Sequence, residues 1–168
     1  VFVLLLTAVS AVFPQTLKLG FFDSQLILAQ YPAAIKAQSD LDAMIQKWNR
    51  TVDSLTTELQ TDYMAYQKQE ATLTEAAKKT KQADLIEKER KINVFKQEKF
   101  SQPRGELYVK QDELLAPVKA AVLQAIEDVA KTEGVKFVFD KSGDIVLLFA
   151  EAEYDLTYKV LDKLKRGK

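Results

Sequence analysis

The sequence predicts an α+β protein in which a long antiparallel helical hairpin, or tentacle, projects from a small β-rich oligomerisation platform. The first observation is an apolar stripe from Leu41 to Leu59 whose steps alternate four and three, the spacing of helices that pack along a seam. The second is a short apolar segment near each end of the chain, with the side-chain alternation of a strand. The third is the composition, because 5 glycines and 4 prolines in 168 residues favour a mostly helical protein.

The helical hairpin is expected to occupy residues 32–133. Pro32 suits the first turn of the outgoing helix, because the N–H that proline lacks has no partner there. Gly134 suits the position just after the returning helix. Each arm holds roughly 45 residues and would extend ~65 Å, so the hairpin must project from a domain of this size. Its tip is placed near residues 76–83, where small alanines replace the larger seam residues.

Two sites are expected to bend the returning arm. One is the segment Gln102-Pro103-Arg104-Gly105, and the other is Pro117, inside an otherwise helical run. A proline inside a helix removes one backbone hydrogen bond and clashes with the preceding turn. Pro103, Gly105 and Pro117 are therefore candidate hinges that would let the arms spread; kinks imposed by packing are the alternative.

The platform is expected to comprise residues 17–31 and 134–168. Its expected elements are a strand at 17–23, a short helix at 25–30 capped by Asp23-Ser24, a strand at 135–140, a turn at 141–144, a strand at 145–150 and a helix from Asp155 to about Leu164.

Three short strands would leave two apolar edges unpaired, and this is a hazard unless something covers them. Association of identical chains through the platform covers such edges in every copy alike. The physics therefore predicts a homo-oligomer, without fixing the number of subunits. The candidate platform residues are Leu19, Phe21, Val135, Phe137, Phe139, Ile145, Leu147 and Phe149.

Charge is uneven along the hairpin although the whole chain is formally neutral. Residues 75–99 carry eight basic and five acidic side chains, whereas residues 33–74 and 100–134 each carry four basic and six acidic ones. The basic tip is expected to touch acidic client segments, anionic lipid or lipopolysaccharide, and a solvated helix surface with pairs four residues apart is the plainer alternative. The candidate client contacts are the aromatics Tyr63, Tyr66, Phe95 and Phe100, for which packing in the seam is the alternative, and the tip cations Lys78, Lys79 and Lys81.

The first residues, VFVLLLTAVSAV, form an apolar run that ends in small side chains. The run is too short to span a bilayer and is typical of a secretory signal peptide with a small-x-small cleavage site. We therefore expect residues 1–11 to be a signal-peptide remnant, with cleavage after Ala11 or as late as about residue 16. An apolar first strand is the alternative.

Several function classes are disfavoured by composition. The chain has no cysteine and no histidine, so thiol chemistry and the usual zinc ligands are excluded. It has no phosphate-binding G-x-x-x-x-G-K motif, and carboxylates on exposed helices have no dry pocket that would shift a pKa. No catalytic, metal or cofactor site is expected, and the neutral charge and the export signal argue against nucleic-acid binding.

Six segments, in this order and spacing, resemble the Skp and OmpH-like family of periplasmic chaperones over nearly the whole mature chain. They are Phe22-Asp23-Ser24, Tyr31-Pro32, Gly105-Glu106-Leu107-Tyr108-Val109-Lys110-Gln111, Glu113-Leu114-Leu115-Ala116-Pro117, Phe139-Asp140-Lys141-Ser142-Gly143 and Tyr154-Asp155-Leu156-Thr157. The resemblance implies a homotrimer with a β-barrel hub and three tentacles around a cavity. It also implies a periplasmic holdase that binds unfolded outer-membrane proteins and prevents their aggregation without ATP.

The main alternative is a structural coiled-coil scaffold or spacer of the cell envelope. Such a protein would need an apolar seam that runs unbroken to the tip. Here the seam fades at Asp62 and Gln69, and the returning arm meets Pro103 and Pro117. The sequence therefore favours the chaperone.

Overall fold

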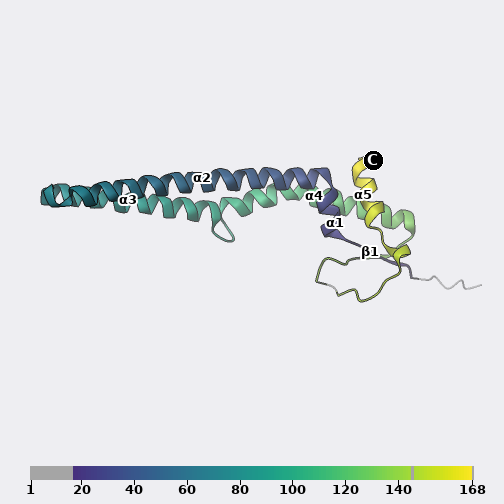
Figure 1. Cartoon of the computed structure of the whole chain (residues 1–168). Coiled ribbons are helices and arrows are strands. Elements are labelled where there is room, and N and C mark those ends of the chain that lie inside the picture. The colour runs from purple at the N-terminus through teal and green to yellow at the C-terminus, as the bar shows by residue number, and fades with distance from the viewer. Residues whose placement is uncertain (1–16, 145, 168) are drawn as a thin grey trace, which may run out of the picture.

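The computed structural model describes residues 17–144 and 146–167, and it shows a long helical hairpin joined at one end to a small base (Figure 1). The expected signal-peptide remnant at residues 1–16 and the platform candidate Ile145 lie outside these residues. Within them, no helix combines the length and the apolar character that a bilayer crossing requires. The elements are β1 (Leu19–Phe22), α1 (Ser24–Gln30), α2 (Pro32–Gln69), η1 (Glu70–Thr72), α3 (Glu75–Phe100), α4 (Glu106–Glu133), β2 (Phe137–Asp140), η2 (Ala152–Tyr154) and α5 (Thr157–Arg166).

The outgoing arm is the single helix α2, which begins at Pro32 as the sequence predicts. Two other helix ends are also fixed by residues close to them in the sequence. The carboxylate of Asp23 accepts a hydrogen bond from the backbone N–H of Leu26 and so caps α1. At the far end of the hairpin, Gly134 ends α4 with a φ of 66°, in the left-handed region that favours glycine. The α+β class and the projecting hairpin are thus confirmed.

The tip of the hairpin lies earlier than predicted. The chain turns at residues 70–74, through η1, and residues 76–83 are already helical. The hydroxyl of Thr74 accepts a hydrogen bond from the N–H of Ala77, which makes Thr74 the N-cap of α3. Placing the tip in the alanine- and lysine-rich stretch was wrong because both residue types are strong helix formers.

The returning arm is made of two helices, α3 and α4, with a loop at residues 101–105 that stands out from the side of the arm (Figure 1). Gly105 is buried in this loop, and a Cβ atom there would lie 2.6 Å from the carbonyl oxygen of Ser101. Only glycine fits this close approach. Pro117 lies inside α4, and the helix continues through it. Whether either site moves as a hinge stays a prediction.

The hydrophobic core lies in the base, where α4 from Val118 onward packs against the start of α2 and against α5, and Ile27 of α1 joins the same cluster. Four residues of α4 are buried, and all lie at or after position 118: Val118, Val122, Ala125 and Val129. Residues 118–133, which the sequence assigned to the arm, therefore belong to the hydrophobic core of the base. The core of the base is mainly helical.

The sheet has two short parallel strands, β1 and β2, with Leu19 opposite Phe137 and Phe21 opposite Phe139. The third strand, expected at residues 145–150, is not formed by residues 146–150. These residues are exposed, with Leu148 and Phe149 showing 92% and 81% of their surface to solvent. The turn at Asp140 and Ser142 is held against the start of α1 by hydrogen bonds, and residues 146–150 pair with no strand among the residues that the structure describes.

Candidate functional site

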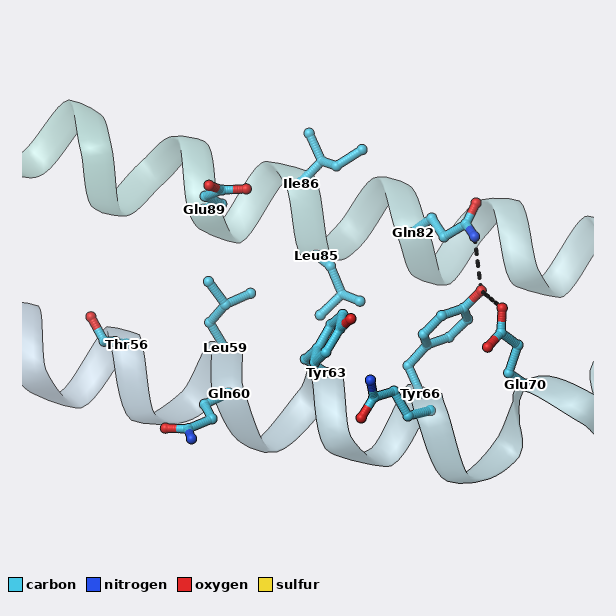
Figure 2. A pocket seen from close by; sticks show the side chains of 11 residues that line it. Thr56, Leu59, Gln60, Tyr63, Tyr66, Glu70, Gln82, Leu85, Ile86 and Glu89 are labelled. Atoms are coloured by element: carbon cyan, nitrogen blue, oxygen red, sulfur yellow. Dashed lines mark hydrogen bonds between the residues drawn. The ribbon is translucent and has the colours of Figure 1, made fainter.

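The distal arm carries an open groove between α2 and α3, close to the turn. Its volume is about 730 Å³. Figure 2 shows Tyr63 of α2 and Leu85 of α3 facing each other across the gap, with Leu59 beside them and Ile86 pointing outward. Tyr63 and Ile86 leave 51% and 66% of their surface exposed. The residues that line this distal groove are Thr56, Leu59, Gln60, Tyr63, Tyr66, Gln67, Glu70, Gln82, Leu85, Ile86 and Glu89.

Tyr66, which the sequence marked as a client contact, is buried and closes the tip end of this groove. Its hydroxyl donates to a carboxylate oxygen of Glu70 at 3.1 Å and accepts from the side-chain amide of Gln82 at 2.8 Å (Figure 2). Burial raises the pKa of the Tyr66 phenol, and the hydrogen bond to Glu70 adds to this rise. The side chain thus links α2 to α3, so the packing alternative holds for Tyr66, whereas Tyr63 is open to solvent.

On the other side of the seam, the ammonium group of Lys88 from α3 contacts the carboxylates of Glu58 and Asp62 from α2. The hydrogen bond to Asp62 has the largest effect and that to Glu58 the next, and both raise the pKa of Lys88 above its ordinary value. The contact explains why a polar residue stands at position 62, where the seam calls for an apolar one. An ion pair across the helices replaces apolar packing there.

The two candidate phenylalanines lie farther down the arm, around the single tryptophan of the chain. Trp48 is buried and meets the ring of Phe100 edge-on, with the ring centroids 5.8 Å apart. The ammonium of Lys99 lies 5.5 Å from the centre of the Trp48 ring and 5.7 Å from that of Phe95. Both phenylalanines are half-buried, so packing uses part of each ring and solvent reaches the rest.

The three candidate tip cations all lie in the first two turns of α3. Lys78 pairs with Glu75 at 2.9 Å, and this hydrogen bond raises the pKa of the lysine. Lys79 and Lys81 are exposed. The correction of the turn to residues 70–74 therefore leaves the three cations close to the end of the arm.

At the base, five of the platform candidates line one apolar cleft of about 650 Å³, beside the two-stranded sheet. They are Leu19, Phe21, Phe139, Leu147 and Phe149. Of the others, Val135 is buried in the core and Phe137 is exposed on β2. The structure thus brings together residues from β1, β2 and the segment 146–150, which lie far apart in the sequence.

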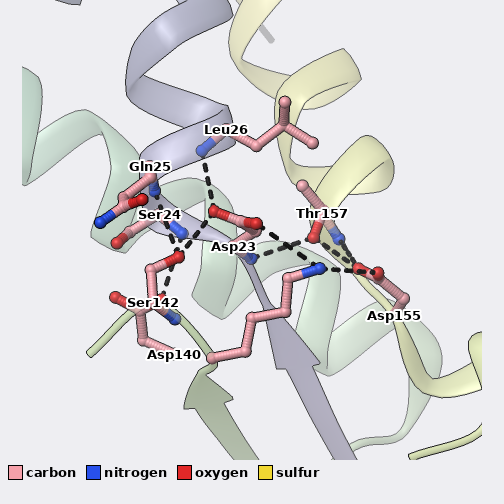
Figure 3. Close-up of polar contacts among 9 residues, drawn as sticks. Asp23, Ser24, Gln25, Leu26, Asp140, Ser142, Asp155 and Thr157 are labelled. Carbon is pink, nitrogen blue, oxygen red and sulfur yellow. Dashed lines mark hydrogen bonds and ion pairs between the residues drawn. The ribbon is translucent and has the colours of Figure 1, made fainter. Parts of the chain in front are cut away.

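A polar network joins the end of β1 to both C-terminal turns (Figure 3). Asp23 accepts a hydrogen bond from the hydroxyl of Ser142 at 2.6 Å and lies 3.5 Å from the ammonium of Lys141, which also approaches Asp155 at 3.8 Å. The hydroxyl of Thr157 accepts from the backbone N–H of Asp23 at 3.0 Å. Residues from three of the six family-like segments therefore contact one another in the base. These contacts explain why an acid, a serine, a lysine and a threonine stand at these positions.

Two acids beside this network, Asp23 and Asp140, have a pKa below the ordinary value. The hydrogen bonds from Ser142 and from the N–H of Leu26 keep the pKa of Asp23 below its ordinary value, and Lys141 adds to the effect. Burial raises the pKa of Asp140, but the hydrogen bonds from Ser24 and Ser142 outweigh it, and the resulting pKa is lowered. Across the described ranges 17–144 and 146–167, the residues include no cluster of three acids that could hold a metal ion. This network therefore connects β1, the start of α1 and the two C-terminal turns.

Sequence reasoning did not identify Leu59, Leu85 and Ile86 as parts of one groove. The signal in α3 was weak, because Leu85 and Ile92 lie seven positions apart and five of the six residues between them are charged. Only the position of α3 against α2 shows that Leu85 completes a groove with Tyr63.

Comparison with known proteins supports the resemblance. The family model described as outer membrane protein (OmpH-like) matches residues 18–164. A solved structure, described as a candidate OmpH-like outer membrane chaperone from Caulobacter crescentus CB15, superposes with a TM-score of 0.78 at 17% identity, covering 97% of this chain and 92% of that one. No curated protein matches the chain. The chain belongs to the OmpH-like family.

Proposed function

We propose that this OmpH-like protein is an ATP-independent holdase of the periplasm, which binds unfolded outer-membrane proteins between helical arms and prevents their aggregation. The observation that carries the proposal is the division of the chain between a projecting arm and a base with an exposed apolar segment. An arm of two helices offers a large surface without a core of its own, as the retention of an unfolded chain by many weak contacts requires.

Assembly into a homotrimer is the second part of the proposal. The described residues 146–150 read VLLFA and lie exposed beside a two-stranded sheet with an open cleft. An extended apolar segment of this kind is aggregation-prone unless another strand or surface covers it. Other copies of the chain are the simplest cover, and the family resemblance favours three copies with the arms around a cavity.

The arm supplies adaptability in this proposal. The loop at residues 101–105 and Pro117 are the candidate hinges, and they would let the cavity fit clients of different size. Lys79 and Lys81 at the end of the arm would attract acidic client segments, anionic lipid or lipopolysaccharide. No catalytic step, cofactor or nucleic acid takes part.

The first test dilutes a urea-unfolded outer-membrane β-barrel protein into buffer with and without the chain from Val12 onward, and follows light scattering without nucleotide. Suppressed scattering at roughly one trimer per client is expected. A well-folded oligomer that leaves aggregation unchanged would contradict the holdase and favour the scaffold.

A shortened arm separates holding from assembly. Trp48 meets Phe100 and Tyr66 meets Gln82, so Leu55 and Asn93 lie at the same level of the hairpin. Removing residues 56–92 and joining the ends by a short glycine-serine turn shortens both sides of the hairpin to the same level. This variant should keep its oligomeric state, measured by multi-angle light scattering, and lose most of its holding.

The oligomer interface is tested by Phe149→Ser combined with Leu148→Ser, with Leu123→Ser as the control. Leu123 is an exposed leucine of α4, so its change also removes apolar surface. Only the double variant is expected to dissociate into monomers at micromolar concentration. A double variant that stays trimeric would place the interface elsewhere.

A further inference from the structure

The two sides of the distal arm have different chemistry. The distal groove lies on one side of the seam, and its lining includes two carboxylates, Glu70 and Glu89, and no basic residue. The hollow on the other side is lined by Lys81, Lys88 and Lys91 together with three acids. These three lysines of α3 thus lie away from the groove, whereas Lys78, paired with Glu75, lies near Glu70 at its tip end.

The apolar floor of the groove is available to a ligand. Leu59 and Leu85 are half-buried between the helices, while Tyr63 and Ile86 stand at the edge with more than half of their surface exposed. The groove is open along the arm (Figure 2), so it can take the side chains of an extended segment without enclosing its backbone. Residues two apart in an extended chain point the same way, so two apolar side chains of one segment can enter together.

From this geometry we infer that the distal groove takes an extended, unfolded segment in which aromatic or aliphatic side chains are flanked by lysine or arginine. The apolar side chains lie against Leu59, Tyr63, Leu85 and Ile86, and the flanking cations lie near Glu70 and Glu89 at the rim. The proposal rests on the proposed holdase function and deepens it. Each arm would then hold such segments by the groove side, while the lysine-bearing side, which includes Lys81, would attract acidic segments.

Charge complementarity selects this occupant. An anionic lipid head group would meet the carboxylates at the rim and no cation inside the groove, so repulsion would oppose its binding. An acidic client segment would meet the same repulsion. A basic flank is attracted instead, and because the rim is exposed, the effect of charge should weaken in high salt.

The test uses three short fluorescein-labelled peptides and measures their binding to the full assembled chain by fluorescence anisotropy. In the first peptide, a tyrosine and a leucine two positions apart are flanked by lysines; in the second, glutamates replace these lysines; in the third, serines replace the tyrosine and the leucine. The affinity of the first peptide should be at least about fivefold higher than that of the second, and this difference should become smaller in high salt. The third should bind about tenfold more weakly than the first.

Matched variants assign the binding to the groove. Ile86→Ser should weaken the lysine-flanked peptide about tenfold, whereas Leu123→Ser, which removes a leucine of nearly equal exposure (62%) on α4, should leave its affinity unchanged. Glu89→Lys should abolish the preference for lysine over glutamate flanks, whereas Glu98→Lys, an exposed position of α3 outside the groove, should preserve it.

Equal binding of the lysine- and glutamate-flanked peptides, or equal effects of Ile86→Ser and Leu123→Ser, would overturn the inference. The light-scattering test keeps this failure apart from failure of the proposed function. A chain that suppresses aggregation equally well with and without Ile86→Ser would remain a holdase that does not use this groove. A chain that suppresses nothing would fail as a holdase whatever the peptides do.

Discussion

The base and the arm of this molecule are stabilised in different ways. In the base, α1, α4 and α5 surround a cluster in which Ile27 and Val160 have no exposed surface and Leu156 has 2%. In the arm, two helices meet along a single seam, and most seam positions between Trp48 and Tyr66 are only half-buried. The difference follows from geometry, because a pair of helices always leaves the outer face of each in solvent, whereas three or more elements can enclose a side chain.

The comparison places most of the stabilising contacts in the base and the proposed binding surface on the arm. Burial in the base fixes the positions of the elements, and the polar network of Asp23, Ser142 and Thr157 fastens the turns around it. The arm relies on an aromatic cluster, a buried tyrosine and an ion pair. Its thin packing leaves apolar side chains such as Tyr63 and Ile86 for partners, and changes on the arm should therefore alter binding more than stability.

The largest expected effect is on the base. Leu156→Ala removes a fully enclosed side chain and should lower the free energy of unfolding by about 2–5 kcal/mol. Leu85→Ala, at a half-buried position of the arm, should cost about 1.5 kcal/mol or less, because solvent reaches the space that it leaves. Urea unfolding followed by circular dichroism at one fixed protein concentration compares the two. Equal losses would remove the distinction between base and arm.

The strongest anchor of the arm should be Trp48. Trp48→Ala removes the edge-on contact with Phe100 and the ring beneath Lys99, and should cost about 2 kcal/mol, less than a tryptophan enclosed on all sides. The loss should be local, so hydrogen exchange should rise in α3 and around residues 101–105 while α5 stays protected. Uniform loss of protection through α5 would mean that arm and base unfold as one unit.

Acid should act mainly on the base. The pKa of Asp23 and Asp140 is lowered from the ordinary 3.8, and hydrogen bonds from Lys163 and Lys159 lower the pKa of Asp128 and Glu133 at the contact between α4 and α5. Carboxylates with lowered pKa contribute stability that is present above their ordinary pKa and lost as the pH falls through the lowered value. The urea midpoint should change little from pH 7 to pH 5 and fall below about pH 4.

A variant isolates the part of this response that belongs to Asp23. Asp23→Asn keeps a side chain that can cap α1 but removes the charge near Lys141. Its stability should be lower at neutral pH and should fall less steeply in acid than that of the unaltered chain. Parallel pH curves for the two proteins would show that Asp23 does not contribute to the acid response.

The smallest effect is expected for the ion pair across the distal arm. Lys88→Met keeps the length of the side chain and removes its hydrogen bonds to Glu58 and Asp62. Because all three side chains are partly exposed, amide exchange near residue 88 should rise by no more than about fivefold, and the global urea midpoint should stay unchanged. Lys91→Met provides the control on the same helix. A large shift of the midpoint would mean that the arm contributes to global stability.

Several features of the molecule follow from residues that are close in the sequence. The alternating spacing from Leu41 onward placed the seam, Pro32 placed the start of α2, Asp23 placed the cap of α1, and Gly134 placed the end of α4. In the last three cases the interaction lies within a few residues along the chain, so the amino-acid types carry it. Tyr63 was marked at this level as a candidate client contact, with packing in the seam as the alternative.

Other features depend on contacts between residues far apart in the sequence, and only the tertiary structure determines them. The parallel pairing of β1 with β2 reflects the return of α4 to the base. The segment 146–150 has the composition of a buried strand, but strand formation requires a neighbouring strand, and within residues 17–144 and 146–167 none pairs with it. The distal groove likewise exists only where Tyr63 meets Leu85 across the seam. Apolar periodicity predicts which side of a helix is covered, whereas the element that covers it is determined by contacts between residues far apart in the chain.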